Sequence, residues 1–139
     1  MKKTYHGSCH CGDVRYRVQL DLAAGSRRCN CRFCLKTHFW KAFVMPADLE
    51  LLQGADRRTD YRGPESQWPE GHVHHWFCRR CGVRCFTDGF LVEFGGDFHC
   101  INLCTLDDAS DEELAATPIQ YEDGRCDAQE RRPAITSFL

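Results

Sequence analysis

The chain has 139 residues, of which 42% are hydrophobic and 27% are charged. This is the composition of a globular protein and not of a disordered one. The formal net charge of −2 gives no reason to expect nucleic acid or an anionic membrane as a partner.

The length fits one domain, expected over residues 1–139, and strand-like segments dominate it. Residues 13–20 alternate apolar and polar side chains, which predicts a half-buried strand. Further short strands are expected at residues 39–45, 49–52, 57–62, 73–77, 90–94 and 99–103.

Turn chemistry separates these strands. Turns are expected at Asp88-Gly89 and at Gly95-Gly96-Asp97, and a surface loop is expected at residues 64–72. One segment predicts a helix instead. Ser110, followed three residues later by Glu113 and then by apolar residues, is typical of a capping box, and Pro118 should end the helix. The sequence therefore predicts a single β-rich domain with one short helix.

Eleven cysteines in so short a chain are the most informative feature of the composition. Such a density is found where thiols pair in an oxidising compartment or where metal holds them in a reducing one. Lys2 and Lys3 are not followed by the apolar run of a signal peptide, and no stretch approaches the roughly 18 apolar residues of a membrane span. We therefore expect a cytoplasmic metal-binding protein. A disulfide framework is the alternative, although an odd number of cysteines would leave one thiol unpaired.

Seven of the cysteines fall into three groups: Cys9 and Cys11, then Cys29, Cys31 and Cys34, then Cys78 and Cys81. A Cys-x-x-Cys-Gly segment, as at residues 78–82, is typical of a zinc-binding turn, because backbone amides point at the sulfurs and glycine permits the bend. In a Cys-x-Cys segment, strand geometry sends both side chains to one face, so two thiolates can bind one ion.

Seven thiolates divide naturally into four and three. The two pairs would form a closed structural site, and the triplet would form a site with one open position, as in catalytic zinc centres. We therefore expect two zinc ions per chain. A second division stays open, in which the triplet takes one further cysteine and the others remain thiols. An iron–sulfur cluster would also need four thiolates, but the spacings match neither common ferredoxin pattern.

Basic residues surround the triplet without an acidic residue among them: Arg27, Arg28, Arg32 and Lys36. Positive charge lowers the pKa of thiols and attracts anionic ligands, so these residues are candidates for binding an anionic small molecule. The alternative is that they are solvated loop charges that balance the thiolates.

The chain resembles the family of glutathione-dependent formaldehyde-activating enzymes, whose domain is shared with centromere protein V. Four segments carry the resemblance: residues 7–16 with Gly-Ser-Cys-His-Cys-Gly, residues 29–34, residues 77–82 with Phe-Cys-x-x-Cys-Gly, and residues 101–107 with Ile-Asn-Leu-Cys-Thr-Leu-Asp. The resemblance implies an all-β, Mss4-like fold of folded sheets. It also implies the division above, with a structural zinc on Cys9, Cys11, Cys78 and Cys81 and a catalytic zinc on Cys29, Cys31 and Cys34.

The implied reaction joins glutathione to formaldehyde as S-hydroxymethylglutathione, which makes the enzyme a carbon–sulfur lyase in the reverse sense. The expected partners are therefore a small thiol such as glutathione and an aldehyde. An open zinc position can bind and ionise a thiol, or it can polarise a carbonyl oxygen. Because three thiolates make the ion a weak Lewis acid, we favour the role as a thiol ligand.

Two other functions stay possible. One is a non-catalytic zinc module that binds a macromolecule, which the balanced charge disfavours. The other is a chaperone-like or exchange-factor module, which rests on analogy of fold alone.

Several further residues lie outside the expected metal pattern. Cys85 could compete with Cys81 as a ligand, and Cys100, Cys104 and Cys126 are interpreted as small core residues. His72, His74 and His75 are interpreted as surface or partly buried histidines and not as ligands. Asp107 could serve catalysis or a structural hydrogen bond equally well.

Overall fold

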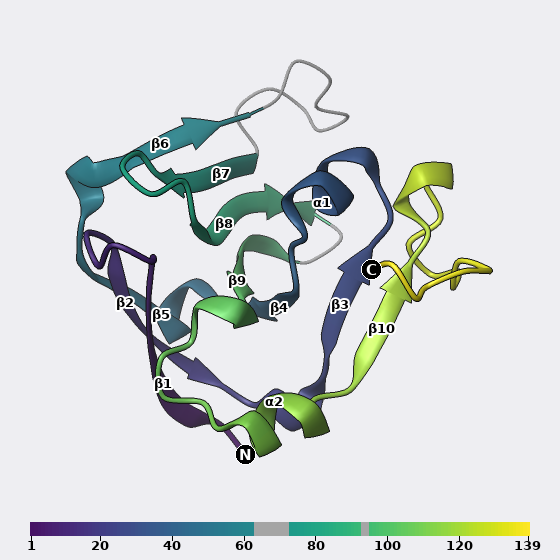
Figure 1. Ribbon diagram of the computed structural model, residues 1–139, viewed down its shortest axis with the longest axis horizontal. Helices are drawn as coiled ribbons and strands as arrows, with labels where there is room; N and C mark the ends of the chain where they lie inside the picture. The colour runs from purple at the N-terminus through teal and green to yellow at the C-terminus, as the bar shows by residue number, and fades with distance from the viewer. Residues whose placement is uncertain (63–72, 93–94) are drawn as a thin grey trace.

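The computed structural model describes residues 1–62, 73–92 and 95–139, and it contains two β-sheets (Figure 1). The expected surface loop at 64–72, and His72 within it, lie outside the described residues. A small antiparallel sheet has the strand order β1-β2-β5, with bounds Lys3–Ser8, Arg15–Leu20 and Leu49–Gln53.

The second sheet has seven strands in the order β10-β3-β4-β9-β8-β7-β6. Its strands are antiparallel except for the parallel pair of β10 with β3. In chain order the bounds are Ser26–Cys29 (β3), Lys41–Val44 (β4), Arg58–Tyr61 (β6), Val73–Cys78 (β7), Arg84–Leu91 (β8), Gly96–Asn102 (β9) and Ile119–Glu122 (β10).

Two short helices accompany the sheets, where the sequence predicted one. The predicted helix is α2, Asp111–Ala116, and its capping box between Ser110 and Glu113 is present. The other helix is α1, Arg32–Thr37, inside the second cysteine group. It was missed because its N-cap is Cys31, whose sulfur accepts a hydrogen bond from the Cys34 amide as a Ser or Asp oxygen would.

Most of the expected strands are present within a few residues of their predicted bounds, and the mostly β class is confirmed. The strands β1, β3 and β10 were not predicted, since β1 and β3 show no clear apolar alternation and β10 has only four residues. The strand expected at residues 90–94 overlaps β8 only at Phe90 and Leu91, and residues 93 and 94 lie outside the described residues. The turn expected at Asp88-Gly89 is wrong, because both residues lie inside β8 and pair with His99 and Phe98 of β9. The turn expected at 95–97 is partly right: Gly95 lies in the β8–β9 connection, and β9 begins at Gly96.

The seven-stranded sheet buries apolar side chains on both of its faces. Ala42 and Val44 of β4 belong to the main core, which the small sheet completes with residues such as Tyr16 and Val18. Phe43, between them, packs against a second cluster formed by Phe39, Leu91, Phe98 and Cys100. Because successive side chains of a strand alternate between faces, β4 is covered on both sides.

Gly7 of β1 lies directly against the ring of Tyr16, its partner in register on β2. A β-carbon at this position would overlap the tyrosine ring, so glycine is required by the close approach. The Tyr16 hydroxyl and the Thr105 hydroxyl are 2.7 Å apart, which ties the small sheet to the segment after β9. Among the described residues, no helix is both long and apolar enough to span a bilayer.

Candidate functional site

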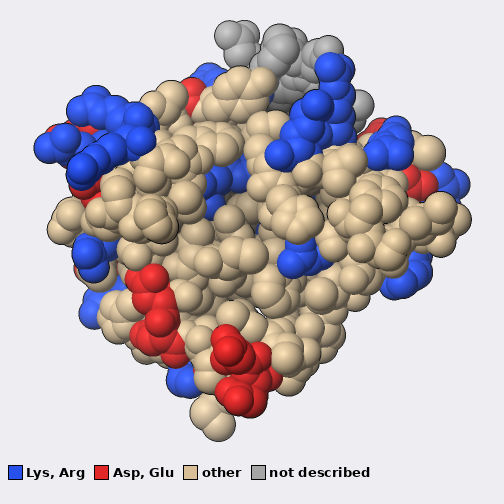
Figure 2. Space-filling view, viewed as in Figure 1, with Lys and Arg blue, Asp and Glu red and all other residues tan. Residues whose placement is uncertain are grey.

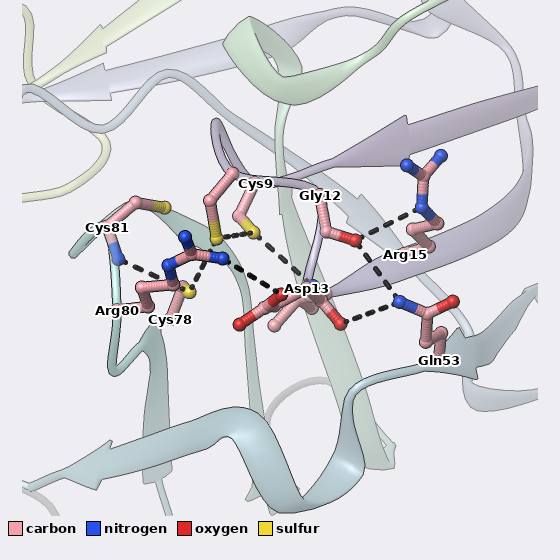
Figure 3. Close-up of polar contacts among 10 residues, drawn as sticks. Cys9, Gly12, Asp13, Arg15, Gln53, Cys78, Arg80 and Cys81 are labelled. Carbon is pink, nitrogen blue, oxygen red and sulfur yellow. Dashed lines mark hydrogen bonds and ion pairs between the residues drawn. The ribbon is translucent and has the colours of Figure 1, made fainter.

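The structure brings Cys9, Cys11, Cys78 and Cys81 together, with all four sulfurs within 4.8 Å of one another. The Sγ atoms of Cys9 and Cys11 are 3.7 Å apart, and those of Cys11 and Cys78 are 3.6 Å apart. Sulfurs around a tetrahedral zinc ion are about 3.8 Å apart, given Zn–S bonds of about 2.3 Å. The two pairs therefore form one four-cysteine site, although Cys11 and Cys78 are 67 residues apart in the sequence (Figure 3).

Each pair lies in a tight turn whose amides point at sulfur. The amide of Val14 donates to Cys9 Sγ at 3.3 Å, and the amide of Cys81 donates to Cys78 Sγ at 3.5 Å. Each turn also needs a residue with positive φ, supplied by Gly12 at 81° and Gly82 at 76°. These contacts hold the Cys9 and Cys78 sulfurs in a fixed direction within the two turns.

Neighbouring side chains support the first turn from outside (Figure 3). Gln53 Nε2 of β5 donates to the carbonyls of Gly12 and Asp13, at 3.3 Å and 3.4 Å. Arg80, from the other turn, is 3.9 Å from the Asp13 carboxylate. Cys85 is buried in the main core and is not one of the four grouped ligands, and burial raises the pKa of its thiol to about 12.

The second site consists of Cys29, Cys31 and Cys34, whose sulfurs also lie within 4.8 Å of one another. Cys29 ends β3, Cys31 caps α1 and Cys34 lies in its first turn. The amides of Cys31 and Cys34 donate to Cys29 Sγ and Cys31 Sγ, each at 3.3 Å. A strand end followed by a helix cap thus points three thiols at one position.

The segment after β10 holds this loop in place. Asn30, which is 5% exposed, donates from Nδ2 to Asp123 at 2.9 Å and accepts from the Arg125 amide at 2.9 Å. Gly124 lies directly against the triplet, since a β-carbon there would overlap Cys29 Sγ and lie 2.9 Å from Cys31 Cβ. None of this segment was predicted as part of the site, because its contact with residues 29–34 is purely tertiary.

The chemistry of the triplet fits a metal cation. Hydrogen bonds from Cys29 and Cys34, together with the Cys34 amide and the charge of Lys41, lower the pKa of Cys31 against the opposing effect of burial. The pKa of Cys34 is raised, because its proton is shared with Cys29 and Cys31. Three thiolates this close repel one another, so full ionisation requires a cation among them. A divalent ion that prefers sulfur, such as zinc, meets that requirement.

The four basic residues predicted beside the triplet lie in different surroundings. Arg28 stacks on Trp40, with its guanidinium carbon 4.9 Å from the ring centroid, and lines a small hollow with Cys29 and Cys34. Arg27 pairs with Glu122 at 3.0 Å. Arg32 and Lys36 are exposed on α1. Figure 2 shows Lys and Arg side chains over the α1 region of this face, whereas Asp and Glu gather over α2.

Sequence reasoning missed three charged residues beside the triplet, two of them buried and the third, Lys41, with a side chain that is 15% exposed. Arg84 of β8 is 4% exposed, and its Nη2 donates at 2.9 Å to Thr37 on the helix that carries Cys34. Lys41 Nζ of β4 is 2.9 Å from Glu122 Oε1, and Glu122 is the strand partner of Cys29. Of the three, only Lys41 lies within a predicted strand, so a charged residue in a strand was an available signal for Lys41 alone, since charged side chains are rarely buried without a specific partner.

These charges are fixed at neutral pH. Burial disfavours the ammonium of Lys41, but the negative charges of Cys34 and Glu122 outweigh it and raise the pKa of Lys41. Burial lowers the pKa of Arg84 to about 10, against the opposing charge of Cys34, and the guanidinium still remains protonated at pH 7. The triplet therefore lies in a positive environment.

Beside this site, the outer side chains of β3 and β4 line an open groove with a volume of about 660 Å³. Arg27 and Lys41 lie at its wall together with Phe43 and Phe98. Its volume falls within the roughly 300–1,000 Å³ of small-molecule sites, and it combines apolar surface with cations that lie near the triplet.

The remaining expectations have mixed outcomes. Cys100 is buried as predicted, whereas Cys104 and Cys126 are exposed, so their interpretation as core residues is wrong; both lie in single-turn helices at the surface. Asp107 accepts a hydrogen bond from Ser8 at 2.7 Å, which is a structural role.

The two described histidines of the predicted cluster are partly buried on β7. His74 pairs with Asp60 at 2.8 Å, and His75 lies 3.1 Å from the Thr87 hydroxyl and 3.2 Å from Arg84 Nη1. These contacts agree with the interpretation of partly buried histidines.

Comparison with known proteins decides the family. The model of the glutathione-dependent formaldehyde-activating enzyme family, abbreviated GFA, matches residues 4–123, which include both cysteine sites. The chain belongs to the GFA family.

One relative is named after this family, and one solved structure has a similar fold. A Halomonas elongata protein named after the GFA family is 33% identical over 79 residues, a stretch that covers 54% of this chain and 50% of the relative. The chain thus matches about half the length of that relative. The crystal structure of a Rhodobacter sphaeroides protein has a TM-score of 0.64 and 29% identity, and the match covers 83% of this chain and 99% of that one. The all-β, Mss4-like class expected from the sequence is confirmed.

Proposed function

We propose that this GFA-family protein binds two zinc ions, one in each cysteine site, and joins a small thiol such as glutathione to formaldehyde or another aldehyde. The four-cysteine site is the structural one, because it closes a tetrahedron and ties β1 to β7. The three-cysteine site is the catalytic one, because three protein ligands leave one position open. A zinc ion held there supplies a position at which a thiol binds in its ionised form.

The reaction is a simple addition. The sulfur electron pair forms the new carbon–sulfur bond, the carbonyl π electrons move to oxygen, and the thiol proton ends on that oxygen as the hydroxyl of S-hydroxymethylglutathione. No oxidant or reductant is needed. The reverse direction breaks the same bond, which is the carbon–sulfur lyase activity.

The observation that carries the proposal is the division of the seven sulfurs into a group of four and a group of three. The residues around the triplet support an anionic thiol ligand, since Arg28 lines its hollow and Lys41 and Arg84 lie beside it. The carboxylates of the thiol substrate are proposed to lie near Arg27, Arg28, Arg32 or Lys36, since guanidinium groups are well suited to bind carboxylates.

The proposed compartment is the reducing cytoplasm, where the cysteines that do not bind metal would stay as thiols. The proposed organisation is a single domain over residues 1–139.

Exchange NMR tests the activity directly. Glutathione and formaldehyde form S-hydroxymethylglutathione spontaneously, so the measurement is the increase in exchange rate at a fixed protein concentration. The wild-type protein should accelerate exchange, and Cys31→Ser, which removes a ligand of the open site, should not. If wild-type protein that holds two zinc ions does not accelerate exchange, the proposed activity is wrong.

Binding gives an independent control. S-methylglutathione keeps every charge of glutathione but has a thioether in place of the thiol, so it should bind much more weakly in calorimetry. Equal affinities for the two compounds would show that sulfur is not a ligand.

A further inference from the structure

The buried charges around the triplet can be assigned to partners one by one. Among the described residues, the buried acidic side chains are Glu122 and Asp123. Asp123 pairs with Arg131 at 2.6 Å. Glu122 lies between Arg27 at 3.0 Å and Lys41 at 2.9 Å, and one of these two cations is enough to neutralise it. One positive charge therefore remains in this group.

Arg84 adds a second positive charge, and it is held rigidly. Its guanidinium carbon is 3.6 Å from the centroid of Phe39 and 4.7 Å from that of Phe33, and its Nε has no hydrogen-bond partner. Phe39 also lines the hollow that contains Cys29 and Cys34. Aromatic faces stabilise the cation but do not neutralise it. Arg84 is thus a fixed charge beside the triplet.

The resulting balance is incomplete without a further anion. Three thiolates around a divalent ion carry one net negative charge. Two cations remain opposite them after Glu122 is matched with Arg27: Arg84, which is 4% exposed, and Lys41, whose side chain is 15% exposed. One positive charge is left in a region of low dielectric, where an unmatched charge is costly. An anionic fourth ligand would cancel this charge, whereas a neutral ligand would not.

We propose that Lys41 and Arg84 make the fourth ligand position of the three-cysteine site selective for ionised thiols over neutral ligands such as an aldehyde oxygen. The inference rests on the proposed function and identifies the substrate that occupies the open position. Both residues act through the field at that position, so they are specificity-determining residues.

Cobalt-substituted protein provides the test, because sulfur-to-cobalt charge-transfer and d–d absorption report the ligands without any need for turnover. Glutathione and imidazole are titrated separately at pH 8, where imidazole is neutral. Lys41→Met should raise the dissociation constant of glutathione about tenfold, the change that corresponds to one pKa unit of the bound thiol. The dissociation constant of imidazole should stay the same. Lys3→Met is the matched control, since Lys3 is an exposed lysine paired with Glu113 on α2.

A charge-restoring variant separates electrostatics from structural damage. Lys41→Met/Glu122→Gln removes one charge of each sign, so the balance returns and glutathione affinity should recover toward that of the wild type. Damage to packing would instead accumulate in the double variant. For Arg84, Arg84→Lys should keep the affinity and Arg84→Met should lose it; if Arg84→Met does not fold, the Lys41 series carries the test.

The outcomes are distinct. Parallel loss of glutathione and imidazole binding, or unchanged glutathione binding in Lys41→Met, would overturn the inference while leaving the proposed function intact. Wild-type protein that binds imidazole but shows no spectral change with millimolar glutathione would overturn both.

Discussion

The two cysteine sites use the same ligand and differ in what holds them. The four-cysteine site joins two turns that are far apart in sequence, and each turn carries its own glycine and its own amide-to-sulfur hydrogen bonds. The three-cysteine site comes from one short segment, residues 29–34. It nevertheless depends on residues outside that segment: Asp123 accepts a hydrogen bond from Asn30, Gly124 lies against the sulfurs, and Lys41 and Arg84 lie beside the triplet.

This difference teaches how one ligand type can serve two roles. Ligands drawn from distant segments convert metal affinity into fold stability, because the unfolded chain cannot bring them together. Ligands drawn from one segment contribute less to the fold, so their surroundings are available to tune chemistry. Lys41 and Arg84 lie near the second site, where the proposed open ligand position would make the local charge matter.

The largest expected effect follows from breaking the four-cysteine site. Cys78→Ser or Cys9→Ser should lower the free energy of unfolding by on the order of 5 kcal/mol, because metal binding there is coupled to folding. Cys31→Ser should fold and retain one zinc ion per chain. Thermal melts with elemental analysis measure both effects. Equal losses of stability in all three variants would remove the distinction between the sites.

A smaller effect is expected at Gly124, where a methyl group would overlap Cys29 Sγ. Gly124→Ala should destabilise the protein by about 2 kcal/mol and displace the triplet, so that zinc falls from two ions per chain to one. The control is Gly82→Ala in the other site, where a β-carbon would meet no atom within 4 Å but φ is 76°. That variant should cost about 1 kcal/mol of backbone strain and keep both ions. If Gly124→Ala still holds two zinc ions per chain, the triplet can move to accommodate the added methyl group.

The surroundings of Arg84 should also give a pH dependence. Burial and the nearby Arg84 lower the pKa of His75 to about 4, below its usual value of about 6.5. Between these values the unfolded chain binds a proton that the folded chain does not, so stability should fall as pH decreases from about 6.5 to about 4. Allowing for partial exposure to water, the effect is about 2 kcal/mol. The measurement is the free energy of unfolding of the wild-type protein and of His75→Asn at several pH values, since the difference between them isolates the contribution of His75. Parallel pH profiles of the two proteins would contradict this prediction.

The smallest expected effect compares two arginines near the triplet. Arg28 lines the hollow with Cys29 and Cys34, whereas Arg32 is exposed on α1. Arg28→Gln should weaken glutathione binding about threefold to fivefold, and Arg32→Gln by less than about twofold, since water screens an exposed charge. Calorimetry at low salt measures both constants, with zinc content as the control. A larger effect from Arg32 would place the substrate carboxylates over α1.

Local sequence patterns predicted the strands with clear apolar character and the helix α2, because alternation and a capping box act within a few residues. They missed α1 because its N-cap is Cys31, a residue of the cysteine triplet and not one of the usual capping residues. They missed β10 because its pairing with β3 is parallel and nearly a hundred residues distant in sequence. The turn at Asp88-Gly89 failed for a related reason, since pairing on both sides extends β8 through a glycine.

The sequence by itself determined the three local cysteine groups, since spacing in Cys-x-Cys and Cys-x-x-Cys-Gly turns is a local property of the backbone, whereas the joining of the first group to the third depended on the fold. It also placed Arg28 beside the triplet. Only the tertiary structure decided which charges face that triplet. Lys41, Arg84 and Glu122 come from three strands, and their position beside residues 29–34 depends on how the seven-stranded sheet is ordered. Electrostatic fields act through space, so the residues that set the chemistry of this site need not be its neighbours in sequence.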